Sequence, residues 1–89
     1  MIVEFDKSFE RSLEKLSNKS LFLKIEKIIS NLEAADSLDD LKSIKKLTGF
    51  KVYYRYRFGD YRIGIERISE NIIRLILIAH RKDIYKLFP

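Results

Sequence analysis

The first residues of the chain combine a short apolar run with a helical repeat of hydrophobic positions. Ile2–Phe5 contains β-branched and aromatic residues, which favour a strand. Asp6 follows directly and is a favourable N-cap residue for a helix. Phe9, Leu13 and Leu16 then recur at i, i+4 and i+7, with charged residues between them. This pattern predicts a strand followed by a short amphipathic helix.

A second and stronger helical repeat follows the polar segment Ser17–Ser20. Its apolar positions recur at i, i+4, i+7, i+8 and i+11, and they are Leu21, Ile25, Ile28, Ile29 and Leu32. Because the segment between the two repeats is short, the two helices are expected to form a hairpin. Residues 34–41 are acidic and irregular, so we expect a loop there that can include one helical turn.

The pattern changes to an alternation of period two in Lys51–Phe58. The even positions are apolar or aromatic, and they are Val52, Tyr54, Tyr56 and Phe58. The odd positions are mostly basic, and they are Lys51, Tyr53, Arg55 and Arg57. Successive side chains of a strand point to opposite faces of the sheet. The alternation therefore predicts a strand with one apolar face and one cationic face.

Two further strands and a short final helix are predicted after this point. Gly59-Asp60 is typical of a two-residue hairpin turn, and Tyr61–Ile68 is the strand that returns from it. Ile72–Ala79 is almost continuously apolar, as expected of a central strand covered on both faces. Ile84–Phe88 is expected to form either a last helical turn or a tail.

The predicted elements follow the order β-α-α-β-β-β with a short C-terminal helical element. Helices that come early and antiparallel strands that come late indicate an α+β class. The N-terminal helical hairpin must pack its apolar stripes on one face of the antiparallel sheet, so the opposite face is left to carry the arginines. No repeat or second domain is visible, and we expect residues 1–89 to form one domain.

The composition narrows the class of protein. The chain has no cysteine and one histidine, which argues against disulfides, cysteine nucleophiles and transition-metal sites. Glycine-rich nucleotide-binding loops are also absent, so we expect neither a metal nor a cofactor. The longest apolar run, Leu75–Ala79, is far shorter than the ~20 residues of a membrane helix. We therefore expect a cytoplasmic protein that does not bind a membrane.

The charges are distributed unevenly along the chain. Residues 1–41 contain six Lys/Arg and nine Asp/Glu, a net charge of −3, whereas residues 42–89 contain twelve and four, a net charge of +8. A basic half in so small a domain indicates a polyanionic partner, either nucleic acid or an acidic protein.

Three arginines are predicted to crowd one face of the sheet near the hairpin turn. With Gly59-Asp60 as the turn, Arg57 lies directly opposite Arg62, and Arg55 lies nearby. Like charges that face each other destabilise a sheet by a few tenths to about 1 kcal/mol. Guanidinium groups bind phosphate bidentately and keep their charge, so an anionic ligand would explain the cluster. The alternative is a solvated face on which each arginine pairs with a surface carboxylate.

The segment after the last strand supplies groups that could transfer protons. It contains His80, Arg81, Lys82 and Tyr85. RNA can be cleaved without a metal because its 2′-hydroxyl is an internal nucleophile. The protein must then stabilise a charged phosphorane, which arginines can do, and must move protons, for which His80 and Tyr85 are the candidates. The structural alternatives are that His80 only ends a strand and that Tyr85 only packs against its neighbours.

Two stretches of the sequence resemble the RelE/ParE superfamily of toxins from type II toxin–antitoxin modules. They are KKLTGFKVYYRYRFGDYRIGIE (Lys45–Glu66) and LILIAHRKDIYKLF (Leu75–Phe88), and the order of elements resembles the superfamily over the whole chain. The resemblance implies a small sheet with a helical hairpin on one face and a basic concave surface on the other. In RelE-like members, the toxin enters the ribosomal A site and cuts messenger RNA with basic and tyrosine side chains and without a metal.

Applied to this chain, the resemblance implies site roles for Arg55, Arg57, Arg62, Arg81 and Tyr85. Together with the residues that the alternation and the final segment supply, the catalytic candidates are Arg62, His80, Arg81 and Tyr85. The RNA-binding candidates are Lys51, Tyr53, Arg55, Arg57 and Lys82. Some RelE enzymes have lysines in place of Arg55 and Arg57, and lysine can transfer protons whereas arginine cannot be deprotonated. Proton transfer in this chain is therefore expected from His80 or Tyr85.

The resemblance also implies partners and leaves two alternative functions. The expected partners are the ribosome, messenger RNA and a cognate antitoxin that is acidic at the contact and partly disordered when free. ParE-like members share the scaffold, lack the nuclease residues and poison DNA gyrase. A third possibility is a non-catalytic member that only binds its antitoxin. The combination of Arg62, His80, Arg81 and Tyr85 favours the messenger-RNA endonuclease.

Overall fold

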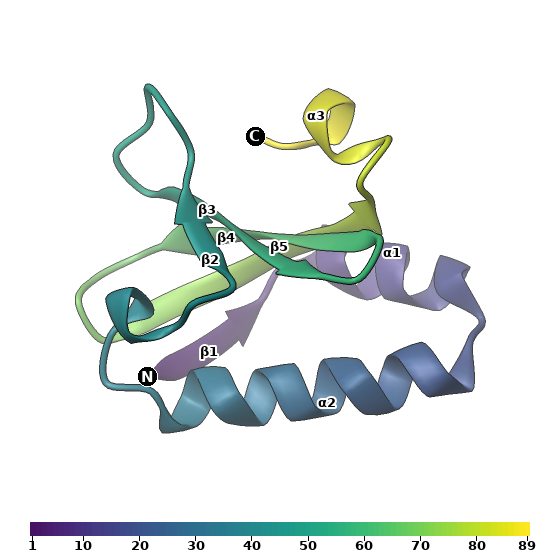
Figure 1. The fold of residues 1–89 in the computed structure, drawn as a ribbon, viewed down its shortest axis with the longest axis horizontal. Coiled ribbons are helices and arrows are strands. Elements are labelled where there is room, and N and C mark those ends of the chain that lie inside the picture. The colour runs from purple at the N-terminus through teal and green to yellow at the C-terminus, as the bar shows by residue number, and fades with distance from the viewer.

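The computed structural model describes residues 1–89 and shows a five-stranded sheet with helices on both faces (Figure 1). The elements in chain order are β1 (Ile2–Phe5), α1 (Lys7–Leu16), α2 (Lys19–Ala34), a 3₁₀ turn (Leu38–Asp40), β2 (Ile44–Lys46), β3 (Tyr53–Phe58), β4 (Tyr61–Arg67), β5 (Ile72–His80) and α3 (Ile84–Leu87). The strand order across the sheet is β1-β5-β4-β3-β2. β1 runs parallel to β5, and all other neighbours are antiparallel. The predicted α+β class is confirmed.

The helical hairpin begins and turns where the sequence predicted. The Asp6 carboxylate accepts a hydrogen bond from the Ser8 backbone N–H at 3.0 Å and caps α1. Ser17 ends α1 in the left-handed conformation with φ 48°, and the Asn18 side chain caps α2. The two helices are therefore separated by only two residues, which folds them side by side.

The sheet differs from the prediction at its outer edge. An additional strand, β2, pairs with β3, and β3 begins at Tyr53 rather than at Lys51. The intervening residues form a loop in which Gly49 has a φ of 85° and the Leu47 N–H donates to the Tyr53 carbonyl at 2.9 Å. β2 has only three residues, too few for an alternation of period two to be visible in the sequence.

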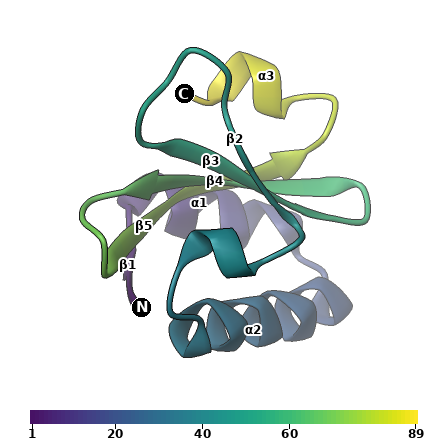
Figure 2. The same ribbon diagram turned by 60° about the vertical axis from the view of Figure 1, so that its left-hand side comes forward.

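The main core lies between the helical hairpin and one face of the sheet (Figure 2). Seven of its side chains are at most 1% exposed, and they are Phe9, Ile25, Leu32, Ile63, Ile65, Ile73 and Leu75. Tyr54 and Tyr56 are also buried in this core, as the alternation predicted. We call the opposite face of the sheet the open face, and α3 covers part of it (Figure 1).

Replacing Leu32 by alanine is expected to lower the free energy of unfolding by about 2–5 kcal/mol, because a fully buried side chain leaves a cavity. Chemical denaturation followed by circular dichroism measures this change. Leu23→Ala is the matched control, since Leu23 lies in the same helix but is 68% exposed, and it is expected to change stability by at most ~0.5 kcal/mol. Equal losses in both variants would contradict the packing of α2 on the sheet through Leu32.

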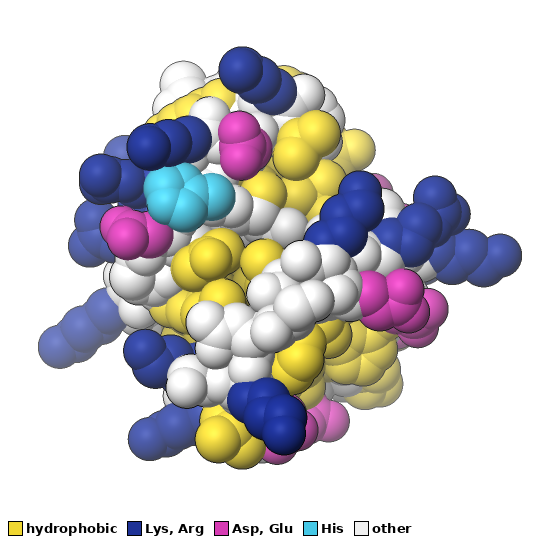
Figure 3. Space-filling view, turned by 90° about the vertical axis from the view of Figure 1, so that its right-hand side faces the viewer, with side chains coloured by type: hydrophobic (Ala, Val, Ile, Leu, Met, Phe, Trp, Pro, Cys, Tyr) yellow, Lys and Arg dark blue, Asp and Glu magenta, His cyan; other side chains and the backbone are white.

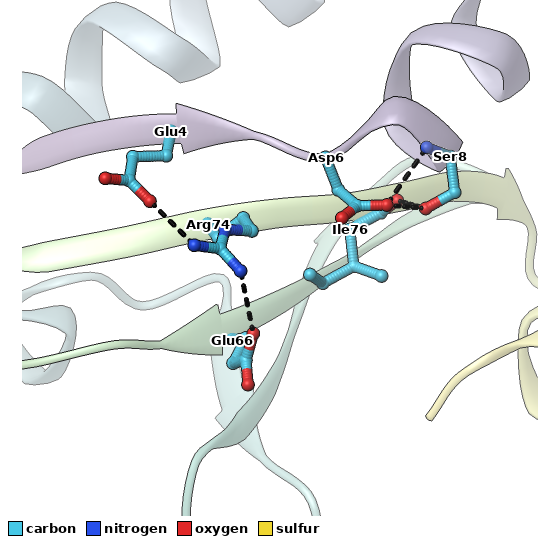
Figure 4. Close-up of polar contacts among 6 residues, drawn as sticks. All are labelled: Glu4, Asp6, Ser8, Glu66, Arg74 and Ile76. Atoms are coloured by element: carbon cyan, nitrogen blue, oxygen red, sulfur yellow. Dashed lines mark hydrogen bonds and ion pairs between the residues drawn. The ribbon is translucent and has the colours of Figure 1, made fainter.

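Polar contacts join three strands and the start of α1 (Figure 4). Arg74 of β5 lies 3.1 Å from a carboxylate oxygen of Glu4 in β1 and 3.8 Å from one of Glu66 in β4. The Ser8 hydroxyl contacts the Asp6 carboxylate and the Ile76 carbonyl, and so connects α1 to β5. Arg74 alternates with the core residues of β5, so this arginine of the open face has two carboxylate partners.

Candidate functional site

A hollow of about 380 Å³ lies on the open face beside the β3–β4 hairpin. Its lining residues are Lys42, Ser43, Ile44, Lys45, Arg55, Arg57, Arg62 and Tyr85. Five of these side chains are cationic and none is acidic, so we call this hollow the basic cavity. Its composition suits a phosphate-bearing ligand, because guanidinium and ammonium groups bind phosphate oxygens with charge-assisted hydrogen bonds.

The basic cavity results from the register of three neighbouring strands. Arg57 pairs directly with Arg62 across the hairpin, as predicted from the Gly59-Asp60 turn. Lys45 of β2 pairs with Arg55 of β3 on the outer side. Paired residues of antiparallel strands project to the same face. The alternation of β3 thus gathers charges from β2, β3 and β4 into one place.

Arg62 is held at the turn of the hairpin. Its Nη1 group donates to the carbonyls of Gly59 at 2.9 Å and Tyr61 at 2.8 Å. Desolvation lowers the pKa of Arg62, and the positive charges of Arg57 and Arg55 lower it further. The protein therefore fixes this guanidinium in a place that disfavours a positive charge, and a bound anion would relieve that penalty.

The arginines of the basic cavity lack carboxylate partners. The ion pairs of the chain involve only Arg74 and Arg81, and no Asp or Glu oxygen lies within 4.0 Å of Arg55, Arg57 or Arg62. The alternative of a solvated face with paired arginines does not describe this surface. Carboxylates accompany Arg74 on the open face, but the hairpin arginines have none, which indicates that their counter-ion comes from another molecule.

Tyr85 of α3 brings a phenol to the basic cavity. Its side chain is 74% exposed, and the Arg55 guanidinium carbon lies 4.7 Å from the centre of its ring. The pKa of Tyr85 is lowered, first by a hydrogen bond from Arg55 and then by the charge of Arg55, with smaller contributions from Arg62 and Lys45. Tyr85 is therefore not a core residue. It is a group able to accept or donate a proton beside three arginines.

His80 lies on the other side of the sheet. It pairs with Tyr61, whose ring centre is 5.7 Å away, and its Nδ1 accepts a hydrogen bond from the Lys82 backbone N–H at 3.2 Å. It lines a second hollow of about 400 Å³ next to α1. Figure 3 views this side of the molecule, where the one histidine of the chain is coloured cyan. His80, one of the two candidates for proton transfer, is therefore separated from the arginines by the sheet.

A β-bulge explains the position of His80. Ile65 pairs with Leu75, but Gly64 pairs with Leu77, so Ile76 is an additional residue in β5. A shift of one residue moves every following side chain to the opposite face. Without the bulge, simple alternation from Leu75 would bring His80 to the open face.

Arg81, Lys82 and Lys51 lie outside the basic cavity. The Arg81 Nε is 3.8 Å from a carboxylate oxygen of Asp60, and its backbone N–H donates to the Asp60 carbonyl at 2.7 Å. The charge of Arg81 still contributes to the lowered pKa of Arg62. Lys82 and Lys51 are exposed and line neither hollow.

Tyr53 lies on the open face, as predicted, but packs within protein. Its ring contacts Phe50 and Phe88 edge-on, with ring centres 5.6 Å and 5.4 Å away. It supports the small core beneath α3. Tyr53 therefore packs beneath α3 and does not line the basic cavity.

Three polar lining residues were not identified from the sequence, and they are Lys42, Ser43 and Lys45. They lie in β2 or directly before it. The basic run Lys42–Lys46, a few residues before the predicted strand Lys51–Phe58, is the signal that could have found them. Its length was insufficient to assign a strand and thus a face.

No group of three or more His, Cys, Asp or Glu side chains is placed to hold a metal ion. None of the helices has both the length and the apolar character needed to cross a membrane.

Known proteins match this chain both in sequence and in overall fold. Residues 3–85 match the family described as the ParE toxin of the type II toxin–antitoxin system parDE. The chain is 44% identical to Toxin RelE3 of Methanocaldococcus jannaschii over the full length of both proteins. The structure superposes with a TM-score of 0.78 on a chain of a RelB–RelE antitoxin–toxin complex from Methanococcus jannaschii, at 39% identity over 97% of this chain and 99% of that chain. A RelE–RelB complex from Pyrococcus horikoshii shares the fold, with a TM-score of 0.71 at 22% identity over 90% of this chain and 93% of that chain.

Proposed function

Because the chain belongs to the ParE toxin family of type II toxin–antitoxin systems, we propose that it is an endoribonuclease that cuts messenger RNA on the ribosome. The observation that carries the proposal is the basic cavity, where five cations without carboxylates surround an exposed tyrosine of lowered pKa. The first requirement of metal-independent RNA cleavage is a site for the scissile phosphate, and the second is a group that takes a proton. The basic cavity supplies both.

The residues of the basic cavity divide the chemistry between them. The Tyr85 phenolate takes the proton of the 2′-hydroxyl, whose oxygen then bonds to the phosphorus. Arg62 stabilises the negative charge of the phosphorane, while Arg55 and Arg57 hold the RNA backbone. The bond from phosphorus to the 5′-oxygen breaks, that oxygen takes up a proton from solvent water, and a 2′,3′-cyclic phosphate remains. Tyr85, which is exposed, then releases its proton to solvent. The exposed ring of Tyr85 also offers a surface on which a base can stack.

The other predicted site residues receive supporting roles in this proposal. Arg81 adds positive charge near Arg62 and guides RNA toward the basic cavity. Lys51 and Lys82 contact RNA only beyond the cavity, and Tyr53 supports α3. His80 receives no proton-transfer step, because the sheet lies between it and the basic cavity.

An antitoxin is the proposed protein partner. The two solved structures named above are complexes of RelE with RelB antitoxins. The lack of acidic lining in the basic cavity favours an antitoxin that supplies carboxylates to this surface. Such a contact would cover the arginines and exclude RNA.

Primer extension on a message translated in a purified system tests the proposed activity. The wild-type protein is expected to produce codon-spaced cuts in the translated message and none in the same message without a start codon. A supercoiling assay with DNA gyrase provides the second arm. No RNA cuts together with stoichiometric inhibition of gyrase would replace the proposal with the gyrase-directed alternative. Inactivity in both assays would favour a protein that only binds its antitoxin.

A further inference from the structure

Gly64 lies where β4 passes beneath the C-terminal residues. It pairs with Arg55 of β3 on one side and with Leu77 of β5 on the other. A Cβ atom placed on Gly64 would lie 2.6 Å from both Cγ and Cδ1 of the Phe88 ring. Gly64 is not among the residues with positive φ, so its backbone does not require glycine. The requirement is space, and the absent side chain leaves a notch that the Phe88 ring fills.

Phe88 is firmly held in this notch. Its side chain is 5% exposed and packs with Ala79 and Ile84. The Tyr53 ring contacts it edge-on at 5.4 Å between ring centres. The Phe88 backbone N–H donates to the Ile84 carbonyl at 2.9 Å, which joins the anchored ring to α3. α3 is thus held on the sheet by one buried residue at each end.

Tyr85 lies between these two anchors but is not itself anchored. It is 74% exposed and belongs to neither hydrophobic core, and the contact that orients it is the one with Arg55. A helix of four residues with one exposed aromatic side chain has little stability of its own. The place of Tyr85 must therefore come from the residues that hold Ile84 and Phe88.

We propose that Gly64 is a positioning residue, whose notch seats Phe88 and thereby holds α3 with Tyr85 against Arg55. The part of this inference that concerns cleavage rests on the proposed function. The part that concerns the position of Tyr85 does not, and it can be measured without RNA. Gly64 contacts neither the proposed substrate nor a reacting atom, so it acts only through Phe88.

Gly64→Ala is the test variant, and the first readout is the titration of the Tyr85 phenol. Ultraviolet difference spectra between each protein and its Tyr85→Phe counterpart isolate this phenol from the other tyrosines. The added methyl group is expected to displace Phe88, separate Tyr85 from Arg55 and raise the titration midpoint toward the usual value of about 10. The second readout is cleavage on the ribosome, where we expect at least a tenfold lower kcat with KM changed less than twofold.

Phe88→Ala provides an independent route to the same state. It empties the notch and is expected to move the Tyr85 titration and kcat in the same direction as Gly64→Ala. In the Phe88→Ala background, adding Gly64→Ala is expected to have less than a twofold further effect, because the ring it would displace is gone. Ile28→Val is the control for lost stability, since Ile28 lies in the main core on the opposite face of the sheet.

An unchanged Tyr85 titration in folded Gly64→Ala protein would overturn the proposal, and so would additive effects of the two substitutions. A shift of the same size in Ile28→Val would also overturn it, because loss of stability would then be the cause. If Gly64→Ala does not fold, the Tyr85 titration is measured in Phe88→Ala, and an unchanged midpoint there overturns the proposal. If wild type cuts no RNA and the Tyr85 titration still moves, the endoribonuclease proposal fails and the positioning role of Gly64 stands.

Discussion

Replacing Arg62 by alanine is expected to slow the cleavage of ribosome-bound messenger RNA by about 10²–10³-fold, the usual loss when one preorganised charge-stabilising donor is removed. Arg62 is fixed at the hairpin turn by two backbone carbonyls, and its charge is penalised by desolvation and by Arg57. The scissile phosphate carries one negative charge in the ground state and approaches two in the phosphorane-like transition state, so its interaction with this guanidinium strengthens as the reaction proceeds. The loss is therefore expected in kcat as well as in kcat/KM.

Single-turnover cleavage at saturating ribosome concentration measures this effect. Arg67→Ala is the matched control, because Arg67 lies on the same strand but its guanidinium carbon is 5.9 Å from the Tyr54 ring centre and outside the basic cavity. Arg62→Lys is expected to fall between wild type and alanine, since lysine keeps the charge but loses the planar fork. Wild-type cleavage by Arg62→Ala would remove Arg62 from the mechanism.

The contrast between Arg74 and the hairpin arginines explains why a charge cluster indicates function here. Both lie on the open face of one small sheet, and both could have acidic neighbours. The chain provides Glu4 and Glu66 for Arg74, and the charge is neutralised within the protein. It provides no carboxylate for Arg57 and Arg62, although the two face each other directly. A surface that served only solubility would intersperse positive and negative side chains, because like charges that face each other destabilise a sheet.

The sequence predicted those parts of the site that depend on local alternation. Arg55, Arg57 and Arg62 belong to one hairpin whose turn is specified by Gly59-Asp60, so period two was sufficient to place them together. Tyr85 was a candidate by residue type, but its position depends on how α3 crosses the sheet. That crossing depends on the contact between Gly64 and Phe88, which are far apart in the sequence.

The errors have equally definite physical causes. β2 was missed because three residues carry too little alternation to identify a strand. His80, a candidate for proton transfer, lies away from the arginines because one additional residue in β5, Ile76, moves the following side chains to the opposite face. A bulge depends on pairing between strands and has no clear signature in an apolar run such as Ile72–Ala79. Residues beyond such a point cannot be assigned to a face from spacing alone.

Replacing Tyr85 by phenylalanine is expected to slow cleavage by about 10²–10⁴-fold, the range of general acid–base catalysis. The substitution keeps the ring that can stack on a base and removes only the group that takes the proton. Base stacking alone would therefore leave the rate of Tyr85→Phe near that of wild type. Tyr61→Phe is the matched control, because Tyr61 lies on the opposite face of the sheet beside His80.

The pH dependence separates proton transfer from any other role of Tyr85. The phenolate is the reactive form, so the wild-type rate is expected to rise with pH and to level off below pH 10, because the pKa of Tyr85 is lowered from its usual value of 10.0. Arg55 is the main cause of that lowering, and Arg55→Gln removes both its hydrogen bond and its charge. The pKa of Tyr85 must then rise, so less phenolate is present at pH 8 and the inflection of the rate profile moves to higher pH. Arg57→Gln is the comparison, since Arg57 is not among the causes of the lowered pKa, and an equal shift of the inflection in both variants would contradict the assignment of Tyr85 as the base.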